Sequence, residues 1–210
     1  DGRPGIVCGK MANAIVEISR RYVIFWPEYE GKSSWEEGFF YNKKGCDANL
    51  TSLTLYVSWP EFYPMEDGAY FDELRSGDEY SGLVVSISPM RSKGDDMTWF
   101  LERYKSLYVA GAENGEFYDE ELDLFFFEVA SAGHSKVAKR VYWYVNNEGI
   151  PVVFKCNYSG TSKEVSSCDG KFIMDDPGYL LELGFSGGKL MRWSELIEGT
   201  KKFILNRVNR

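Results

Sequence analysis

The sequence is poor in the side chains on which most catalytic and metal sites depend. It contains one histidine, His134, among 210 residues, whereas zinc sites of the Cys₂His₂ or His₃ kind need at least two. A Ser-His-Asp or Cys-His arrangement could be built only around His134. The four cysteines form no C-x-x-C pair, which argues against a zinc ribbon or a thioredoxin-like redox site. We therefore predict no metal, no cofactor and no catalytic residues.

Long apolar runs and an excess of positive charge are also missing. No segment approaches the ~18–20 apolar residues that a membrane-spanning helix needs, so we expect no membrane span. The polar start at Asp1 suggests a mature chain from which a targeting segment or anchor has been removed. Against 24 Lys and Arg stand 32 Asp and Glu, a net charge of −8. Nucleic acids and anionic lipids bind basic surfaces, so a basic protein surface is the partner that fits best.

Apolar and aromatic residues are abundant, at 44% and 16% of the chain, which is typical of a folded protein. Thr51–Trp59 alternates, with Leu53, Leu55 and Val57 on one face, and this pattern predicts a half-buried strand. Further strand signals occupy residues 15–18, 22–26, 83–88, 122–129, 141–145, 152–156 and 179–185. The Asn146–Gly149 turn between two of them predicts a hairpin.

Two segments have helical periodicity, and each closes one half of the sequence. The first is Asp96–Tyr108. The second is a continuous apolar stripe formed by Trp193, Leu196, Ile197, Thr200, Phe203, Ile204 and Val208. We therefore predict an α+β protein of two similar lobes, residues 1–112 and 113–210, each an antiparallel sheet closed by an amphipathic helix. A single continuous sheet spanning both halves is the alternative.

The cysteines are even in number and widely spaced, which suits disulfides and an oxidising compartment. Three pairings are open, and we favour Cys8–Cys46 with Cys156–Cys168. The second pair would close a short loop rich in Ser and Gly, which is worth roughly 3 kcal/mol. Four buried free thiols in a cytosolic protein are the alternative.

Residues 184–188 match G-x-S-x-G, a nucleophile elbow that would expose Ser186. That elbow needs a parallel sheet and a histidine after the serine, whereas this chain predicts antiparallel hairpins and His134 precedes Ser186. We interpret the motif as a flexible turn from strand to helix, and His134 as an exposed loop residue.

The densest acidic stretch contains aromatic residues, and we predict that it binds a partner. It comprises Glu113, Glu116, Phe117, Tyr118, Asp119, Glu120 and Glu121. Negative charge would steer a basic partner and the aromatic rings would anchor it. A solvated linker face and a paired-carboxylate catalytic site are the alternatives.

Two proline-braced loops add aromatic residues to the predicted partner-binding set. They are Trp26 and Tyr29 beside Pro27, and Phe62 and Tyr63 between Pro60 and Pro64. Rigid aromatic loops lose little entropy on binding. The alternative role for these residues is to cap the core.

A family resemblance rests on three segments. These are Tyr22–Pro27 followed by Gly45-Cys46, then Leu53–Pro64, and the terminal strand, glycines and Trp-bearing helix of Tyr179–Val208. Together they resemble bacterial periplasmic immunity proteins of type VI secretion systems, particularly those that protect against phospholipase effectors. The resemblance implies a non-enzymatic inhibitor that binds a secreted antibacterial toxin in the periplasm and blocks its active site. It supplies no motif from which individual functional residues could be assigned.

The prediction is therefore a periplasmic immunity protein whose partner is its cognate effector, a lipase or phospholipase. One alternative is a secreted serine hydrolase that uses Ser186. The other is a non-catalytic structural module of the cell envelope.

Overall fold

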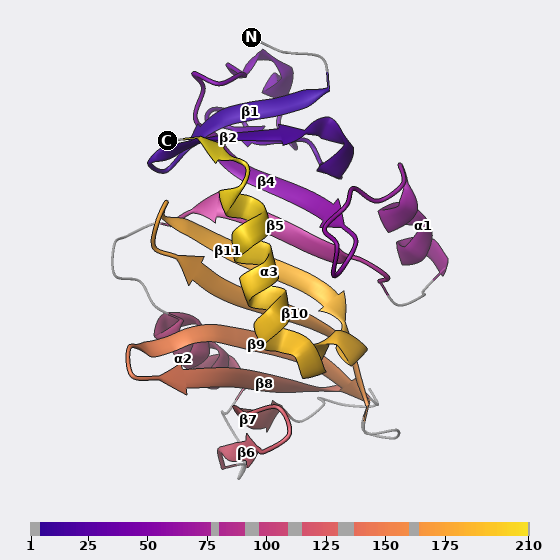
Figure 1. The fold of residues 1–210 in the computed structure, drawn as a ribbon, viewed down its shortest axis with the longest axis vertical. Coiled ribbons are helices and arrows are strands. Elements are labelled where there is room, and N and C mark those ends of the chain that lie inside the picture. The colour runs from indigo at the N-terminus through magenta and orange to yellow at the C-terminus, as the bar shows by residue number, and fades with distance from the viewer. Residues whose placement is uncertain are drawn as a thin grey trace.

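Two antiparallel sheets form the framework of the computed structural model, which describes residues 5–76, 80–90, 97–108, 115–129, 137–159 and 164–209. The small sheet has the order β1-β2-β12. The large, nine-stranded sheet has the order β3-β4-β5-β11-β10-β9-β8-β7-β6 (Figure 1). The strands of the small sheet are β1 Ile6–Met11, β2 Ala14–Ser19 and β12 Val208–Asn209. Those of the large sheet are β3 Glu28–Tyr29, β4 Leu50–Val57, β5 Leu83–Pro89, β6 Phe117–Asp119, β7 Leu124–Val129, β8 Val137–Asn146, β9 Gly149–Ser159, β10 Val165–Met174 and β11 Tyr179–Ser186.

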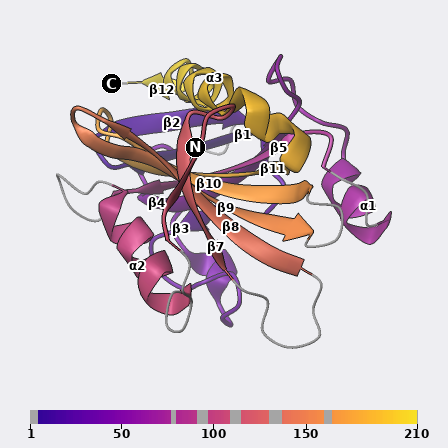
Figure 2. The same ribbon diagram turned by 90° about the horizontal axis from the view of Figure 1, so that it is seen from below.

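Helices cover the two faces of the large sheet. Figure 1 shows α3, Trp193–Leu205, across one face, and Figure 2 shows α2, Thr98–Tyr108, on the opposite face. A short helix α1, Ala69–Ser76, lies beyond one end of β4 and β5, and 3₁₀ turns occupy Arg20–Tyr22, Phe39–Tyr41 and Gly187–Arg192. None of the helices in these ranges is long and apolar enough to cross a membrane.

The alternation predicted for the strand around Leu53 is confirmed in β4. Leu53, Leu55 and Val57 are all at most 1% exposed and belong to the core cluster that also contains the inner side of α3. The predicted stripe of α3 is confirmed as well, because Leu196, Thr200 and Ile204 are fully buried or nearly so. Full burial of one large aliphatic side chain contributes about 1.5–3 kcal/mol to stability. The buried face therefore holds α3 against the large sheet.

The predicted helical stripe extends too far at its C-terminal end, because it includes Val208. The helix ends at Leu205, and the N–H of Arg207 bonds to the carbonyl of Ile204. Val208 then enters β12 and pairs with Val16 of β2. The backbone of Val208 pairs with the edge of β2 that β1 leaves unpaired. The chain therefore continues as a strand at this point and not as a helix.

The second helix seals a smaller core on the other face. Met97 and Leu101 are at most 1% exposed and pack against Phe127, Val141 and Val153. The predicted helix over Asp96–Tyr108 is therefore present from Thr98 onward, and Asp96 lies outside the described residues.

The α+β class is confirmed, and the two halves share one sheet, the arrangement that the sequence left as an alternative. β5 of the first half pairs with β11 of the second, with Val85 opposite Leu183 and Ile87 opposite Leu181. These four side chains are at most 1% exposed. Separate lobes would leave two long apolar edge strands unpaired, which is unfavourable. The predicted boundary at residues 112 and 113 lies outside the described residues, and the division into two domains stays a prediction.

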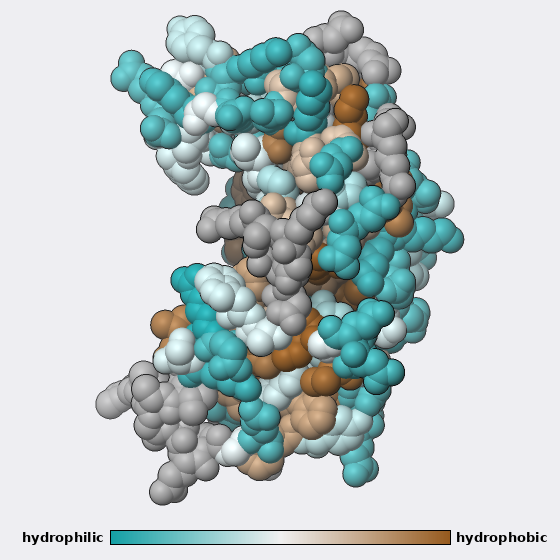
Figure 3. All heavy atoms as spheres, turned by 90° about the vertical axis from the view of Figure 1, so that its left-hand side faces the viewer, coloured by the Kyte–Doolittle hydropathy of each residue, from teal (hydrophilic) through white to brown (hydrophobic). Residues whose placement is uncertain are grey.

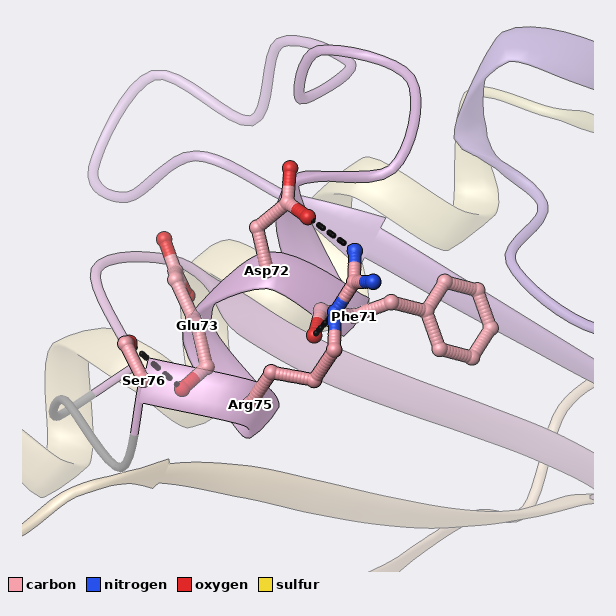
Figure 4. Close-up of polar contacts among 5 residues, drawn as sticks. All are labelled: Phe71, Asp72, Glu73, Arg75 and Ser76. Atoms are coloured by element: carbon pink, nitrogen blue, oxygen red, sulfur yellow. Dashed lines mark hydrogen bonds and ion pairs between the residues drawn. The ribbon is translucent and has the colours of Figure 1, made fainter.

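The α1 helix was not predicted, and it has both aromatic and polar contacts, since Tyr70 packs against Tyr56 and Tyr80 with ring centroids 5.6 Å apart in each pair. Figure 4 shows the side chain of Arg75 reaching Asp72 and the carbonyl of Phe71, and that of Ser76 reaching the carbonyl of Glu73. The carboxylate of Glu73 accepts hydrogen bonds from the hydroxyls of Tyr56 and Ser81. Burial and the bond to Glu73 raise the pKa of Tyr56 to about 12.

Candidate protein-binding edge of the large sheet

The acidic, aromatic segment predicted to bind a partner forms one edge of the large sheet. β6 is the terminal strand, and it pairs with β7 through a tight hairpin in which Phe117 lies opposite Phe126 and Tyr118 opposite Phe125. We call the hairpin Glu116–Val129 the acidic edge. Figure 1 shows it at the far end of the sheet from the small sheet.

The register of three strands stacks aromatic rings into two cross-strand ladders. On the α2 side, Tyr118, Phe125 and Trp143 follow one another, with ring centroids 5.1 Å and 5.9 Å apart. Each pair of this kind contributes beyond its buried area, by about 0.5–1.5 kcal/mol. The inner ring is buried, since Trp143 is only 3% exposed, whereas Tyr118 is 48% exposed. The exposed rings are thus mounted on a buried one.

The second ladder runs along the α3 side. Phe117 stacks on Phe126 with ring centroids 5.4 Å apart, and Phe126 contacts Tyr142 at 5.5 Å. Tyr142 is 1% exposed and Phe117 is 48% exposed. Both faces of the edge therefore present a ring that is held in place from behind, and such rings lose little conformational entropy when a partner covers them.

Acidic side chains surround these rings, and several are fixed by local bonds. Asp119 accepts the N–H groups of Glu121 and Leu122 at 3.2 Å and 3.1 Å and so shapes the turn. Asp123, with a φ of 55°, accepts the Tyr118 hydroxyl, and this bond raises the pKa of Tyr118. Glu120 and Glu121 are exposed, and Glu113 lies outside the described residues.

The acidic edge is also joined to α2. Lys105 forms ion pairs with Glu116 at 2.8 Å and with Glu102 at 3.4 Å. Burial lowers the pKa of Lys105, but the two carboxylates outweigh burial and the net shift is upward. Glu116, Asp119 and Asp123 thus serve the local structure, and this does not favour the paired-carboxylate alternative, in which a free acid and base would flank a substrate.

The aromatic loops lie elsewhere. Trp26 precedes β3, the terminal strand at the opposite edge of the sheet, and it is 58% exposed. Tyr63 is 67% exposed, while Phe62 is half-buried and stacks on Phe203 of α3 at 5.3 Å. The predicted partner-binding residues therefore do not form one surface.

Tyr29 requires a correction. Its side chain is 6% exposed, and its hydroxyl donates a 2.8 Å hydrogen bond to the carbonyl of Cys8. Tyr29 is a core residue beneath β1 and not an exposed loop residue, and the small exposed part of its side chain lines a pocket at the β3 edge. The core-capping alternative holds at this position.

Sequence reasoning missed Phe125 and Trp143, which complete the ladder behind Tyr118. Both were assigned to strands, but their neighbours across the sheet follow from the pairing of β7 with β8. The sequence shows that both segments are rich in aromatic residues, and this was the available signal. The spacing of those residues along the chain does not reveal which rings lie opposite one another.

The Ser186 motif is a packed turn. Ser186 is 5% exposed, and its Oγ accepts a 2.7 Å hydrogen bond from Lys189 Nζ. β11 is antiparallel to both of its neighbours, whereas a nucleophile elbow needs parallel strands. A Cβ at Gly187 would lie 1.9 Å from the carbonyl oxygen of Val165, so this glycine is required for packing. His134 lies outside the described residues.

Both predicted disulfides are confirmed, Cys8–Cys46 and Cys156–Cys168. The second joins directly opposed residues of β9 and β10. In the described ranges, the one group of potential metal ligands is Cys8, Glu17 and Cys46. The two sulfurs of that group are bonded to each other and are therefore not thiolates.

A broad groove accompanies α2. It has a volume of about 610 Å³ and runs between α2 and the sheet, with Trp99, Arg103, Ser88 and Glu182 among its lining residues. Figure 3 shows the surface hollowed on the side of the molecule away from α3.

Comparisons with known proteins give two structural neighbours. No family model and no curated protein matches the sequence. Smlt3025, an immunity protein of the Stenotrophomonas maltophilia type IV secretion system, superposes with a TM-score of 0.60 at 13% identity, over 98% of this chain and 94% of that one. FrpD, an iron-regulated outer membrane lipoprotein of Neisseria meningitidis, gives a TM-score of 0.51 at 11% identity, over 99% and 94% of the two chains. The whole chain therefore has a fold that is also found in these two proteins.

Proposed function

We propose that this chain is an immunity protein that neutralises a secreted antibacterial effector by binding and covering it. The observation that carries the proposal is the acidic edge, where exposed Phe117 and Tyr118 contact Phe126 and Phe125, and these rings in turn contact two buried rings, those of Tyr142 and Trp143. Aromatic anchors on a rigid support are typical of binding hot spots, and the negative charge favours a basic partner. The fold shared with an immunity protein over nearly the whole chain supports the same role.

The protein acts by occlusion and not by catalysis. Ser186, the one nucleophile in a catalytic-type motif, is buried and hydrogen-bonded. Two disulfides favour an oxidising, extracytoplasmic location, and we assign the protein to the periplasm. The assignment to a lipase or phospholipase effector, and to a type VI system, rests on the sequence resemblance. The structural neighbour Smlt3025 is an immunity protein of a type IV system.

The test is a binding and protection assay with the effector encoded beside this gene. Charge reversal at Glu120 and Glu121 should slow association and weaken binding at low salt, and Phe117→Ala or Tyr118→Ala should each weaken it about 10–100-fold. Glu66→Lys, an exposed change away from the acidic edge, is the matched control.

Protection of a sensitive cell should fall in parallel with affinity. Unchanged affinity in all the acidic-edge variants, with Glu66→Lys also neutral, would refute this interface. Failure of the intact chain to bind or to protect would refute the function.

A structural module of the cell envelope is the second candidate, and the similarity to an outer membrane lipoprotein favours it. Deletion of the gene distinguishes the two proposals. Loss of an immunity protein sensitises the cell only when the effector is present, whereas loss of an envelope module alters the envelope without it.

A further inference from the structure

A small pocket lies at the β3 edge of the large sheet, opposite the acidic edge. It forms where β1, the turn after β2, the segment before β3, the Phe39–Tyr41 turn and the Cys46 loop meet. Its volume is about 200 Å³, and it is lined by Ile6, Val7, Cys8, Arg20, Trp26, Pro27, Tyr29, Phe39, Lys44 and Gly45. An apolar cavity of about 150 Å³ accepts a benzene ring, so this pocket has room for one aromatic side chain.

The charge of the pocket is unlike that of the chain. Arg20 and Lys44 are both positive, and no described lining residue is acidic. Elsewhere in the described ranges eight Lys and Arg residues pair with carboxylates. Among the residues that the structure describes, neither Arg20 nor Lys44 forms an ion pair with an acid. In a protein of net charge −8, two exposed cations beside an apolar pocket favour an anionic ligand there.

Both cations are held beside aromatic rings at the pocket. The guanidinium of Arg20 lies 5.7 Å from the Trp26 ring, and its Nη1 donates to the carbonyl of Val23 at 3.1 Å. Lys44 Nζ lies 5.6 Å from the ring of Phe39. The Cys8–Cys46 disulfide ties β1 to the loop that carries Lys44, so the walls are preorganised.

We propose that this pocket binds a carboxylate carried on an aromatic or alkyl stem the size of one side chain. The stem occupies the space between Trp26, Tyr29 and Phe39, and the carboxylate meets Arg20 and Lys44. Charge-assisted contacts of this kind are about twice as strong as neutral ones. A free small acid and the C-terminal residue of another protein share this chemistry. The proposal does not rest on the proposed function, because the pocket and the acidic edge lie on opposite edges of the sheet.

The test is titration of the folded chain with 3-phenylpropionate, followed by Trp fluorescence and amide NMR shifts. We expect a Kd of about 0.1–1 mM, given the ligand's size. The neutral analogue 3-phenylpropanamide should bind at least about 10-fold more weakly, because it lacks the charge. Arg20→Gln and Lys44→Gln should each weaken the acid about 5–10-fold and leave the amide unchanged.

Arg103→Gln is the matched control, since Arg103 also lies over a tryptophan, Trp99, at 5.3 Å, but on α2. The tripeptide Gly-Gly-Phe and its C-terminal amide form the second arm. Tighter binding of the peptide acid assigns the site to a chain terminus, and binding of 3-phenylpropionate alone assigns it to a small carboxylate. Equal binding of the acids and their amides overturns the proposal. So does the absence of binding by either acid at 10 mM, which is about ten times the largest Kd expected. Lys44→Gln decides the question if Arg20→Gln does not fold.

Discussion

The hydroxyl of Tyr179 is the atom whose removal should most clearly stabilise the protein. The side chain is fully buried in the core that α3 completes. Its oxygen has less than 1 Å² of exposed surface and no hydrogen-bond partner among the described residues. A buried polar group left unbonded costs about 1–3 kcal/mol. Tyr179→Phe keeps the ring and removes that cost, so the free energy of unfolding should rise by about 1–2 kcal/mol.

Guanidinium unfolding followed by fluorescence measures the change, and for a chain of this size Tm should rise by about 2–4 °C per kcal/mol. The matched control is Tyr29→Phe. Its ring is also buried, but its hydroxyl donates a 2.8 Å bond to the Cys8 carbonyl. Here the same substitution leaves an acceptor unpaired and should lower stability by about 1 kcal/mol. Equal effects of the two substitutions, or a loss of stability in Tyr179→Phe, would refute the reasoning.

The pH dependence gives a second readout of the same hydroxyl. Burial raises the pKa of Tyr179 to about 12, so the folded chain keeps a proton that the unfolded chain loses near pH 10. The stability contributed by this group is present below pH 10 and is lost as pH rises towards 12. Tyr179→Phe lacks this loss, and its advantage over the wild type should therefore widen between pH 10 and 12. An advantage independent of pH over that range would contradict the raised pKa.

Two further predictions concern packing and cross-linking. Gly187→Ala should destabilise by about 3 kcal/mol or more, because its Cβ would overlap the Val165 carbonyl, whereas Gly188→Ala, which meets nothing within 4 Å, should be nearly neutral. Equal thermal stability of the two variants would contradict the packing role. Replacing Cys156 and Cys168 together by Ala should lower the unfolding free energy by about 3 kcal/mol, given their separation of 12 residues. A loss below about 1 kcal/mol in guanidinium unfolding would show that the closed loop contributes little to stability.

Strands were predictable from the sequence wherever buried residues alternate with exposed ones without interruption. Strand β10 was not predicted, because its alternation is interrupted. Cys168, Phe172 and Met174 face the core in β10, but Gly170 occupies the fourth inward position and hides the pattern. That glycine is required because a Cβ would lie 2.8 Å from the Phe154 ring. The close approach belongs to the neighbouring strand, so no local pattern could reveal it.

The candidate site was predictable in composition but not in arrangement. The acidic and aromatic character of residues 116–121 was evident from the sequence, and the structure places them at a sheet edge. The support of Tyr118 by Trp143 depends on register across three strands, and register is fixed by long-range pairing. Tyr29 was misjudged for the same reason, since its burial follows from its contact with β1.

The division between faces and edges explains how this fold can persist at 13% identity. The faces of the large sheet bury residues such as Leu55 and Leu183, where any apolar side chain of suitable size preserves the core. The exposed positions of the edges carry no such constraint, and here one edge is acidic and aromatic while the other has a cationic pocket at Arg20 and Lys44. For the proposed function, we therefore expect recognition to reside at positions that the shared fold leaves free to vary. The interface of a neighbour cannot be transferred by superposition, and it has to be located by substitutions at the two edges of this chain.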